Sequence, residues 1–361
     1  MQGWLDSQSR AGIKPPDNQT VPPLPRWGTP KMGPYTVGVI PEVVQQWRVY
    51  ISVVTMGPSI SRNVTIWGAL AHECGHDITL ADNGFIDECA QKLYSKILNA
   101  SELQGLDVIY NSTPEPLAKR AAQVWRFWTV EIVADVLGIL NFGPSSAIAY
   151  AVLAAALSGN KLRSEGRASD THPVDVLRVL MAADLVKEIS SLNANIRNAW
   201  SDALIRIVDK YASNKDKITL GHITPFGFRP TVEFPFEPMR ETTKIVAKTL
   251  GYDEFKTLEN HYLAEINTWA DNDEIIANRI ADDLLGNKEP SLESQPGETE
   301  VFPAHIIAGA IYALTESADV SAITDLSVSA LSKSYDRNQV WAGFPIRYTS
   351  DFHIHSFYNP L

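Results

Sequence analysis

Cysteine is scarce in this sequence, and so is positive charge. Only Cys74 and Cys89 occur among 361 residues, which argues against a disulfide framework and favours a reducing compartment or a fold indifferent to redox conditions. Lys and Arg number 31 against 42 Asp and Glu, so the net charge is -11, and no stretch gathers the basic residues into a cluster. A nucleic acid, whose phosphate backbone needs such a cluster, is therefore not an expected partner.

Signals for export and for membrane insertion are also missing. The first six residues lack the basic and apolar parts of a secretory signal, so we expect a cytoplasmic protein. An uncharged run at residues 136–157 is broken by Gly143 and Pro144 and has no aromatic or basic flanks. This run favours a buried core helix over a membrane span, and membrane association is not expected.

The stretch Ala71–Ile78 carries the motif HExxH. On a helix, His72 and His76 lie one turn apart on the same face, so both imidazoles can reach one metal ion, and Glu73 projects beside them. The apolar run that leads into the motif, residues 64–71, predicts a buried helix, which would give a metal site rigid support. The motif is short enough to arise by chance, so the prediction of a metal site needs a third ligand.

A candidate for that ligand lies in a long helix that we expect at residues 117–140, after Pro114 and Pro116. Glu131 and Asp135 are four residues apart and share one face of this helix, among mainly apolar neighbours. Two carboxylates on such a face are costly unless a cation meets them, and a metal ion with its histidines would do so. The alternative is a solvated stripe, or a salt bridge to Lys or Arg on a neighbouring element.

A third motif consists of Thr171, His172 and Pro173, with Arg178 six residues after the histidine. With HExxH first and ExxAD at residues 131–135 between them, the motifs make the sequence resemble the gluzincin metallopeptidases. The most similar branch contains the CAAX prenyl endopeptidases and the bacterial heat-shock membrane metallopeptidases. Members of that branch usually carry transmembrane helices around the motifs, and this sequence shows no convincing one.

The resemblance implies three zinc ligands, His72, His76 and Glu131. It also implies that Glu73 is the general base and that Asp135 supports a ligating histidine from behind. Arg178 would hold a carboxylate near the site, and His172 would donate to the oxyanion of the reaction. For His172 a second interpretation stays open, in which it belongs to the first turn of a helix capped by Thr171 or Asp170.

The residues point to zinc chemistry without the resemblance as well. Two imidazoles and one carboxylate leave a fourth position open, which is typical of catalytic rather than structural zinc. Zinc lowers the pKa of water and polarises a carbonyl, and Glu73 can take a proton from the water and pass it to the leaving amine. The prediction is a zinc-dependent endopeptidase that acts on a peptide or protein. Two alternatives are a metal-binding scaffold without catalysis and a secreted effector protease with one protein target.

The expected fold class is mostly α, or α+β. It would be a zincin-like core with a small β element before the HExxH helix and a helical C-terminal half. We expect three parts: a Pro-rich extended arm at 1–34, the metallopeptidase core at 35–215, and a mainly helical region at 216–361 that can pack with the core as one body. The arm is either loosely held or ordered across the body. Residues 47–56 predict a strand, and this strand could be the edge that pairs with extended substrate.

Further helices are expected where apolar residues recur at spacings of three and four. They cover residues 85–98, 147–157, 174–192, 196–211, 239–250, 255–285 and 304–314. In residues 216–238 prolines alternate with aromatic residues. That stretch predicts a long ordered loop or a pair of short extended pieces.

Overall fold

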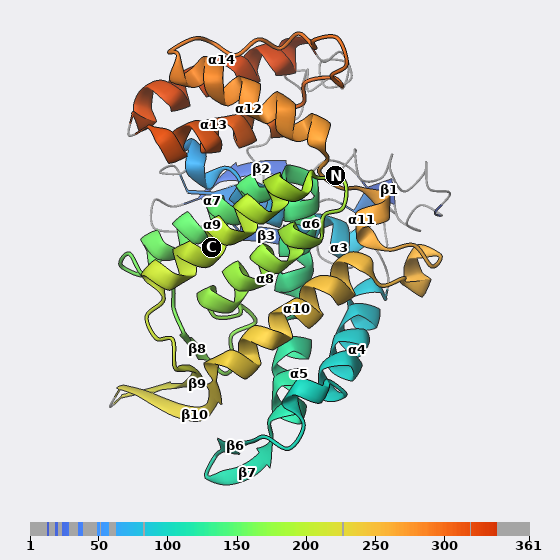
Figure 1. Cartoon of the computed structure of the whole chain (residues 1–361), viewed down its shortest axis with the longest axis vertical. Coiled ribbons are helices and arrows are strands. Elements are labelled where there is room, and N and C mark those ends of the chain that lie inside the picture. Colours follow the sequence, from blue (N-terminus) through green and yellow to red (C-terminus); the bar gives the residue numbers. More distant parts are fainter. Residues whose placement is uncertain are drawn as a thin grey trace, which may run out of the picture.

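The structure is a computed structural model that describes most of the chain. The described residues are 13, 19–20, 24–28, 35–38, 49–50, 52–57, 63–81, 84–225, 227–317 and 319–337. In these residues the protein is mostly helical with small sheets, which confirms the expected fold class at that level (Figure 1).

Most of the proline-rich arm at 1–34 lies outside the described residues. Two described pieces of it are strands: β1 (Gln19–Thr20) pairs with β4 (Val49–Tyr50), and β2 (Leu24–Trp27) pairs with β5 (Ser52–Met56). How the rest of the arm lies, loosely held or ordered across the body, falls outside the described residues.

Two helices that carry motifs cross near the centre of the molecule. Helix α3 (Ala69–Ala81) contains HExxH and packs along α6 (Thr129–Phe142). The approach is close because glycine lies at the contact: a Cβ added to Gly75 would be 2.7 Å from the backbone oxygen of Ala134. Small residues on facing helices let two backbones come this near, and the two motifs are therefore brought together.

The single long helix expected at 117–140 is wrong in one respect. Helix α5 (Leu117–Phe127) ends at Phe127, and α6 begins at Thr129, with Trp128 between them. The Thr129 hydroxyl donates to backbone oxygens three and four residues earlier, at 3.0 and 3.1 Å, and such local bonds often bend or interrupt a helix. Glu131 consequently lies in the first turn of a new helix.

Other helices surround this central pair. They are the short 3-10 helices η2 (Val64–Ile66) and η3 (Ser101–Leu103), and the helices α4 (Phe85–Leu98), α7 (Pro144–Leu157), α8 (Asp175–Glu188), α9 (Ala194–Tyr211) and α10 (Phe236–Tyr252). The uncharged run at 136–157 thus forms the end of α6 and α7, broken at Gly143 as expected. Among the described residues, no helix combines the length and apolarity that a membrane crossing would require.

The C-terminal helices form a layer of their own at the top of Figure 1. This layer contains α12 (Asp271–Leu285), α13 (Pro303–Glu316) and α14 (Val320–Arg337), and α13 packs against α7 and η2. The helix expected at 255–285 is wrong in extent, because only η4 (Lys256–Leu258) and α11 (Leu263–Ile266) precede α12.

A local backbone conformation explains that break. Glu259 and Asn260 have φ values of 53° and 66°, a left-handed conformation that no right-handed helix can include.

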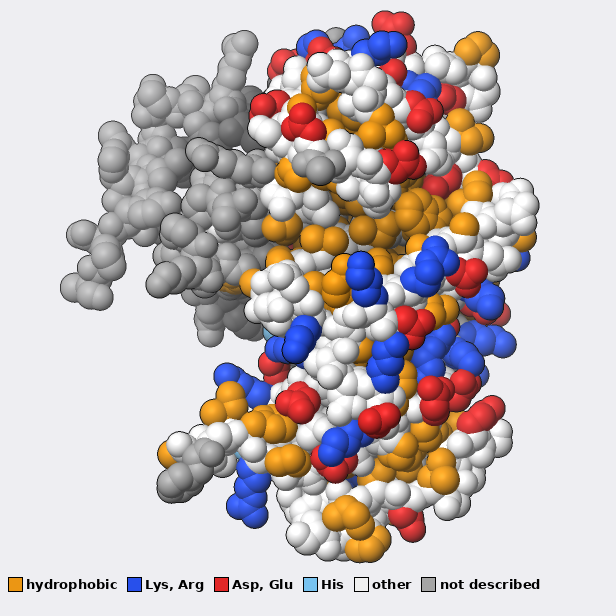
Figure 2. Space-filling view, turned by 60° about the vertical axis from the view of Figure 1, so that its left-hand side comes forward, with side chains coloured by type: hydrophobic (Ala, Val, Ile, Leu, Met, Phe, Trp, Pro, Cys, Tyr) orange, Lys and Arg blue, Asp and Glu red, His pale blue; other side chains and the backbone are white. Residues whose placement is uncertain are grey.

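On the face drawn in Figure 2, hydrophobic side chains gather below the C-terminal helices, and charged side chains of both signs are spread over the rest.

A five-stranded sheet carries the loop with the third motif. Its order is β7 (Thr113–Pro116), β6 (Asp107–Tyr110), β10 (Gly227–Pro235), β9 (Lys217–Thr224) and β8 (Glu165–Arg167), antiparallel except for β8 with β9. Residues 216–238 therefore contain a hairpin, the second of the two expected alternatives. The sheet joins strands from both sides of residue 216, and one buried apolar cluster includes residues from both.

The expectation that the strand at 47–56 forms a free edge is wrong. Strand β5 is paired on both sides, with β2 in parallel and with β3 (Tyr35–Gly38) in antiparallel orientation. In the described part of this sheet the edge next to α3 is β3. The prediction rests on the position of residues 47–56 near the HExxH helix, and position in the sequence does not show that β2 and β3 cover both edges of β5.

Candidate metal centre

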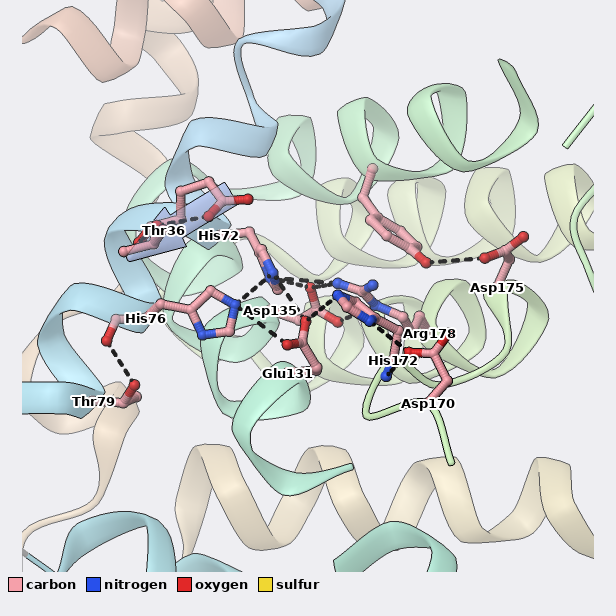
Figure 3. A network of polar contacts seen from close by, with 12 residues as sticks. Thr36, His72, His76, Thr79, Glu131, Asp135, Asp170, His172, Asp175 and Arg178 are labelled. Carbon is pink, nitrogen blue, oxygen red and sulfur yellow. Dashed lines mark hydrogen bonds and ion pairs between the residues drawn. The ribbon is translucent and has the colours of Figure 1, made fainter. Parts of the chain in front are cut away.

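The side chains of His72, His76 and Glu131 converge between α3 and α6 (Figure 3). The Nε2 atoms of the two histidines are 3.0 Å apart. Nε2 of His72 lies 3.3 Å from Oε2 of Glu131, and Nε2 of His76 lies 3.6 Å from Oε1. The histidine side chains are each 14% exposed, so the site is reached from solvent while its walls are buried.

These separations suit a tetrahedral metal ion. Ligand atoms about 2.0–2.2 Å from zinc, at tetrahedral angles, lie about 3.3–3.6 Å from one another. The observed distances of 3.0 to 3.6 Å, of which those to Glu131 are measured to Oε2 from His72 and to Oε1 from His76, are close to that edge length. The three ligand atoms also come from one helical turn of α3 and one residue of α6, so helix packing fixes their separation.

Glu131 is the candidate ligand whose surroundings most favour a nearby positive charge. The residue is 7% exposed, and its Oε2 has no hydrogen-bond donor of suitable geometry among the described residues. Burial raises the pKa of Glu131, but the neighbouring imidazoles of His72 and His76 outweigh that effect and hold the pKa well below its usual range. A buried carboxylate that stays ionised and lacks a donor is costly, and a bound cation removes this cost.

Asp135 fixes the orientation of His72. Its Oδ1 lies 2.8 Å from Nδ1 of His72, so Nδ1 carries the hydrogen and Nε2 presents its lone pair to the metal position. The contact of His72 Nδ1 with Arg178 Nη2 is longer, at 3.4 Å, and both atoms carry hydrogen in this arrangement. The shorter bond to Asp135 therefore determines the tautomer.

Arg178 holds Asp135 in place from the other side (Figure 3). Its Nε donates to Oδ2 at 2.7 Å and its Nη2 to Oδ1 at 2.5 Å, a bidentate pair between residues that are 5% and 8% exposed. Burial raises the pKa of Asp135, and the charge of Arg178, with that of His72, more than reverses the change, so the pKa is lowered. Asp135 thus remains an anion beneath His72.

The contacts of His72 with Asp135 and Glu131 favour a proton or a metal cation on the His72 ring. Burial lowers its pKa, but the charge of Asp135, the hydrogen bond to Asp135 and the nearby carboxylate of Glu131 raise it to about 9. Two Nε2 atoms that face each other at 3.0 Å need a proton or a cation between them. The donor set, with two imidazoles and a carboxylate, fits zinc.

His172 lies on the open side of the site. It follows β8 in a loop, its side chain is 54% exposed, and its Nε2 is 3.4 Å from Oε2 of Glu131. Asp170 holds it through bonds of 2.7 Å to Nδ1 and 3.0 Å to the backbone N–H. Helix α8 begins later, after Val174, and Asp170 and Thr171 do not cap it. The interpretation of His172 as part of a capped first turn is therefore wrong.

Glu73 is buried next to the ligands, at 5% exposure. Its Oε2 accepts a hydrogen bond of 2.6 Å from the hydroxyl of Thr36 on β3. The same hydroxyl lies 3.1 Å from the backbone oxygen of Glu73, but it has one hydrogen, and the shorter contact is to the carboxylate. The edge strand and the HExxH helix are thus connected at the residue expected to act as base.

The structure brings together the predicted site residues His72, Glu73, His76, Glu131, Asp135, His172 and Arg178, and adds Thr36, which bonds to Glu73, and Tyr150, whose ring lies against Arg178. Asp170, which the sequence offered only as a helix cap, bonds to His172 instead. Thr36 and Tyr150 carry no motif. Comparisons of the chain with protein-family models, with curated proteins and with solved structures find no match. The chemistry of the site therefore has to be inferred from its geometry.

Proposed function

We propose that the protein is a zinc-dependent endopeptidase of the gluzincin type, with His72, His76 and Glu131 as zinc ligands. The observation that carries the proposal is the buried carboxylate of Glu131, whose two oxygens lie 3.3 and 3.6 Å from the Nε2 atoms of His72 and His76, while those two nitrogens face each other at 3.0 Å. The support of His72 by Asp135 and Arg178 adds to it, because catalytic zinc sites orient their histidines in this way.

Zinc in this position would lower the pKa of water to about 7 and polarise the scissile carbonyl. Glu73 would accept the proton from the water and later deliver it to the leaving amine. Thr36 holds one oxygen of Glu73, which limits the carboxylate to a small set of orientations. The chain thus supplies a base whose position is fixed by a strand and a helix together.

His172 would stabilise the negative charge that develops on the carbonyl oxygen. For this role Nε2 must carry a hydrogen, and Nδ1 already donates to Asp170 at 2.7 Å. The side chain of His172 is exposed and lies beside Glu131, so a substrate bound at the site can contact it.

A peptide or protein is the substrate class that the surroundings favour. Strand β3 forms the described edge of its sheet and contacts α3, and Thr36 of this strand bonds to the proposed base. An edge strand offers backbone donors and acceptors to an extended peptide, which could then lie across the metal position.

Replacement of Glu73 by glutamine tests the proposal. The variant should keep about one zinc per chain, because Glu73 is not a ligand, and should lose at least about 100-fold in peptide cleavage, because the base is gone. Cleavage is measured with a peptide library, with zinc-stripped protein as the blank. Glu102→Gln, an exposed site in η3, is the matched control and should cleave normally.

Two results would contradict the proposal. Protein purified without chelators that contains no zinc, and takes none up, would remove the metal centre. A Glu73→Gln variant that cleaves at the rate of the unaltered chain would remove Glu73 from the reaction and leave at most a metal-binding role.

A further inference from the structure

Behind the candidate metal centre, Arg178 lies against the face of an aromatic ring. Its guanidinium carbon is 3.9 Å from the ring centroid of Tyr150, which belongs to α7. A guanidinium over an aromatic face is attracted by the ring electrons, and more strongly where water is excluded. Arg178 is 5% exposed, so the contact is of this water-excluded kind.

Tyr150 is itself held from behind by a second buried carboxylate. Its hydroxyl donates to Oδ1 of Asp175 at 3.4 Å. Asp175, 1% exposed, accepts three shorter bonds of 2.9 Å from Arg163: from the backbone N–H, from Nε and from Nη2. Burial raises the pKa of the Tyr150 phenol, so the hydroxyl stays protonated and can donate. The ring is consequently fixed at both its face and its edge.

Little free space exists around these groups. The cavity that His72, Asp135, Tyr150 and Arg178 help to line measures only about 10 Å³, which is about the size of one water molecule. A smaller side chain at position 150 would remove the ring that packs against the guanidinium of Arg178. Arg178 could then rotate away from the geometry in which both its nitrogens meet Asp135.

We propose that Tyr150 is a positioning residue of the metal centre: its ring face keeps Arg178 aligned with Asp135, and Asp135 in turn orients His72 toward the metal. The proposal rests on the proposed metal site and names a residue that is connected to the ligand His72 through Arg178 and Asp135. Tyr150 touches neither substrate nor metal and acts only through Arg178.

Two substitutions separate this role from simple filling of the core. Tyr150→Phe keeps the ring face and removes only the bond to Asp175. Tyr150→Leu keeps an apolar side chain and removes the ring face. A third variant, Phe255→Leu, removes a fully buried ring that packs on Phe85 of α4, away from the metal centre, and controls for loss of stability.

Zinc affinity of the folded, whole chain is measured by competition with a chromophoric chelator. Tyr150→Leu should bind zinc about tenfold more weakly, the low end of the range for groups behind metal ligands. Tyr150→Phe and Phe255→Leu should stay within about twofold of the unaltered chain, because both leave the Arg178 contact intact. Equal affinities for Tyr150→Leu and the unaltered chain would overturn the proposal, and so would equal losses for the Leu and Phe variants.

A second readout needs neither metal nor activity. In zinc-free protein, the NMR signal of the Arg178 Nε–H should be shifted by the ring current, and the shift should persist in Tyr150→Phe and vanish in Tyr150→Leu. If the unaltered chain shows this shift but binds no zinc, both the proposed function and the positioning role fail. If it binds zinc and the variants match it, only the positioning role fails.

Discussion

The candidate metal centre has a buried side and an open side, and they are built differently. On the buried side, His72, Asp135 and Arg178 come from three helices and are locked by bonds of 2.5 to 2.8 Å. On the open side, Asp170 and His172 belong to a loop, and the histidine side chain is 54% exposed. Under the proposed function the two sides would have different tasks: packed helices would fix the geometry of the ligands, and a loop would present a group to substrate.

The buried side has an energetic cost that the open side avoids. A buried ion pair such as Asp135 with Arg178 often contributes little net stability, because both charges must leave water. What it provides is a defined orientation for His72. The exposed pair of Asp170 and His172 costs little, and solvent screening leaves it weak as a source of stability.

Removal of Glu131 should have the largest effect on zinc affinity. Glu131→Ala deletes a ligand, so the affinity should fall by more than the roughly 100-fold that changes behind a ligand can cause. Zinc content after purification and a chelator competition measure this, with Glu102→Ala as the exposed control. Unchanged zinc content would mean that the third ligand lies elsewhere, with Asp135 as the next candidate.

Asp135→Asn should have the next largest effect. Zinc affinity should fall about 10- to 100-fold, because the carboxylate behind His72 is lost. The free energy of unfolding should also fall by about 3–5 kcal/mol, because Arg178 keeps a buried charge without a partner.

The chain offers a matched control for that change. Asp184 is as buried as Asp135, both at 8% exposure, and pairs with Arg240 in a similar bidentate contact. Asp184→Asn should lower the unfolding free energy in denaturant titrations without changing zinc affinity. Equal zinc affinities for the two variants would show that Asp135 is only a structural partner of Arg178.

Gly75→Ala tests the helix crossing on which the buried side depends. The added Cβ would meet backbone atoms of Ala134 at 2.7 and 2.8 Å, so α3 and α6 must move apart. We expect a loss of about 1–3 kcal/mol in unfolding free energy from overpacking, and a few-fold loss in zinc affinity. Gly286→Ala, where the nearest atoms are 3.3 Å away, should change neither quantity much. A Gly75→Ala variant as stable as the unaltered chain would show that the crossing is not this tight.

His172→Gln should have the smallest effect on zinc affinity and still reduce the reaction. Loss of an oxyanion donor typically lowers kcat about 100- to 1,000-fold. Zinc affinity should remain within about twofold, since His172 is not a ligand in this arrangement. A large loss of zinc would instead identify His172 as a fourth ligand, and the contrast between the two sides would disappear.

The sequence allowed several parts of the site to be predicted, because they depend on local periodicity. The spacing of His72 and His76 places them on one helix face, and the spacing of Glu131 and Asp135 does the same on a second helix. The helix at 85–98 was expected from apolar spacing and has those bounds in the structure. Such features follow from interactions between residues three or four positions apart.

Other features depend on contacts between distant segments, which no local pattern of residues predicts. Strand β5 is a central strand because the short strands β2 and β3 pair with it, and this pairing brings Thr36 of β3 to Glu73. Tyr150 lies in an uncharged helix with the composition of ordinary core, and only the fold places its ring against Arg178.

By itself, then, the sequence determined which residues share a helix face and which chemistry they could support. The tertiary structure decided how far apart those faces lie: the close approach of Gly75 to Ala134 sets the distance between the histidines and Glu131, and the break at Trp128 sets where α6 begins. The physical reason is that helical periodicity is local, whereas the distance between two helices depends on how side chains from the whole chain pack between them.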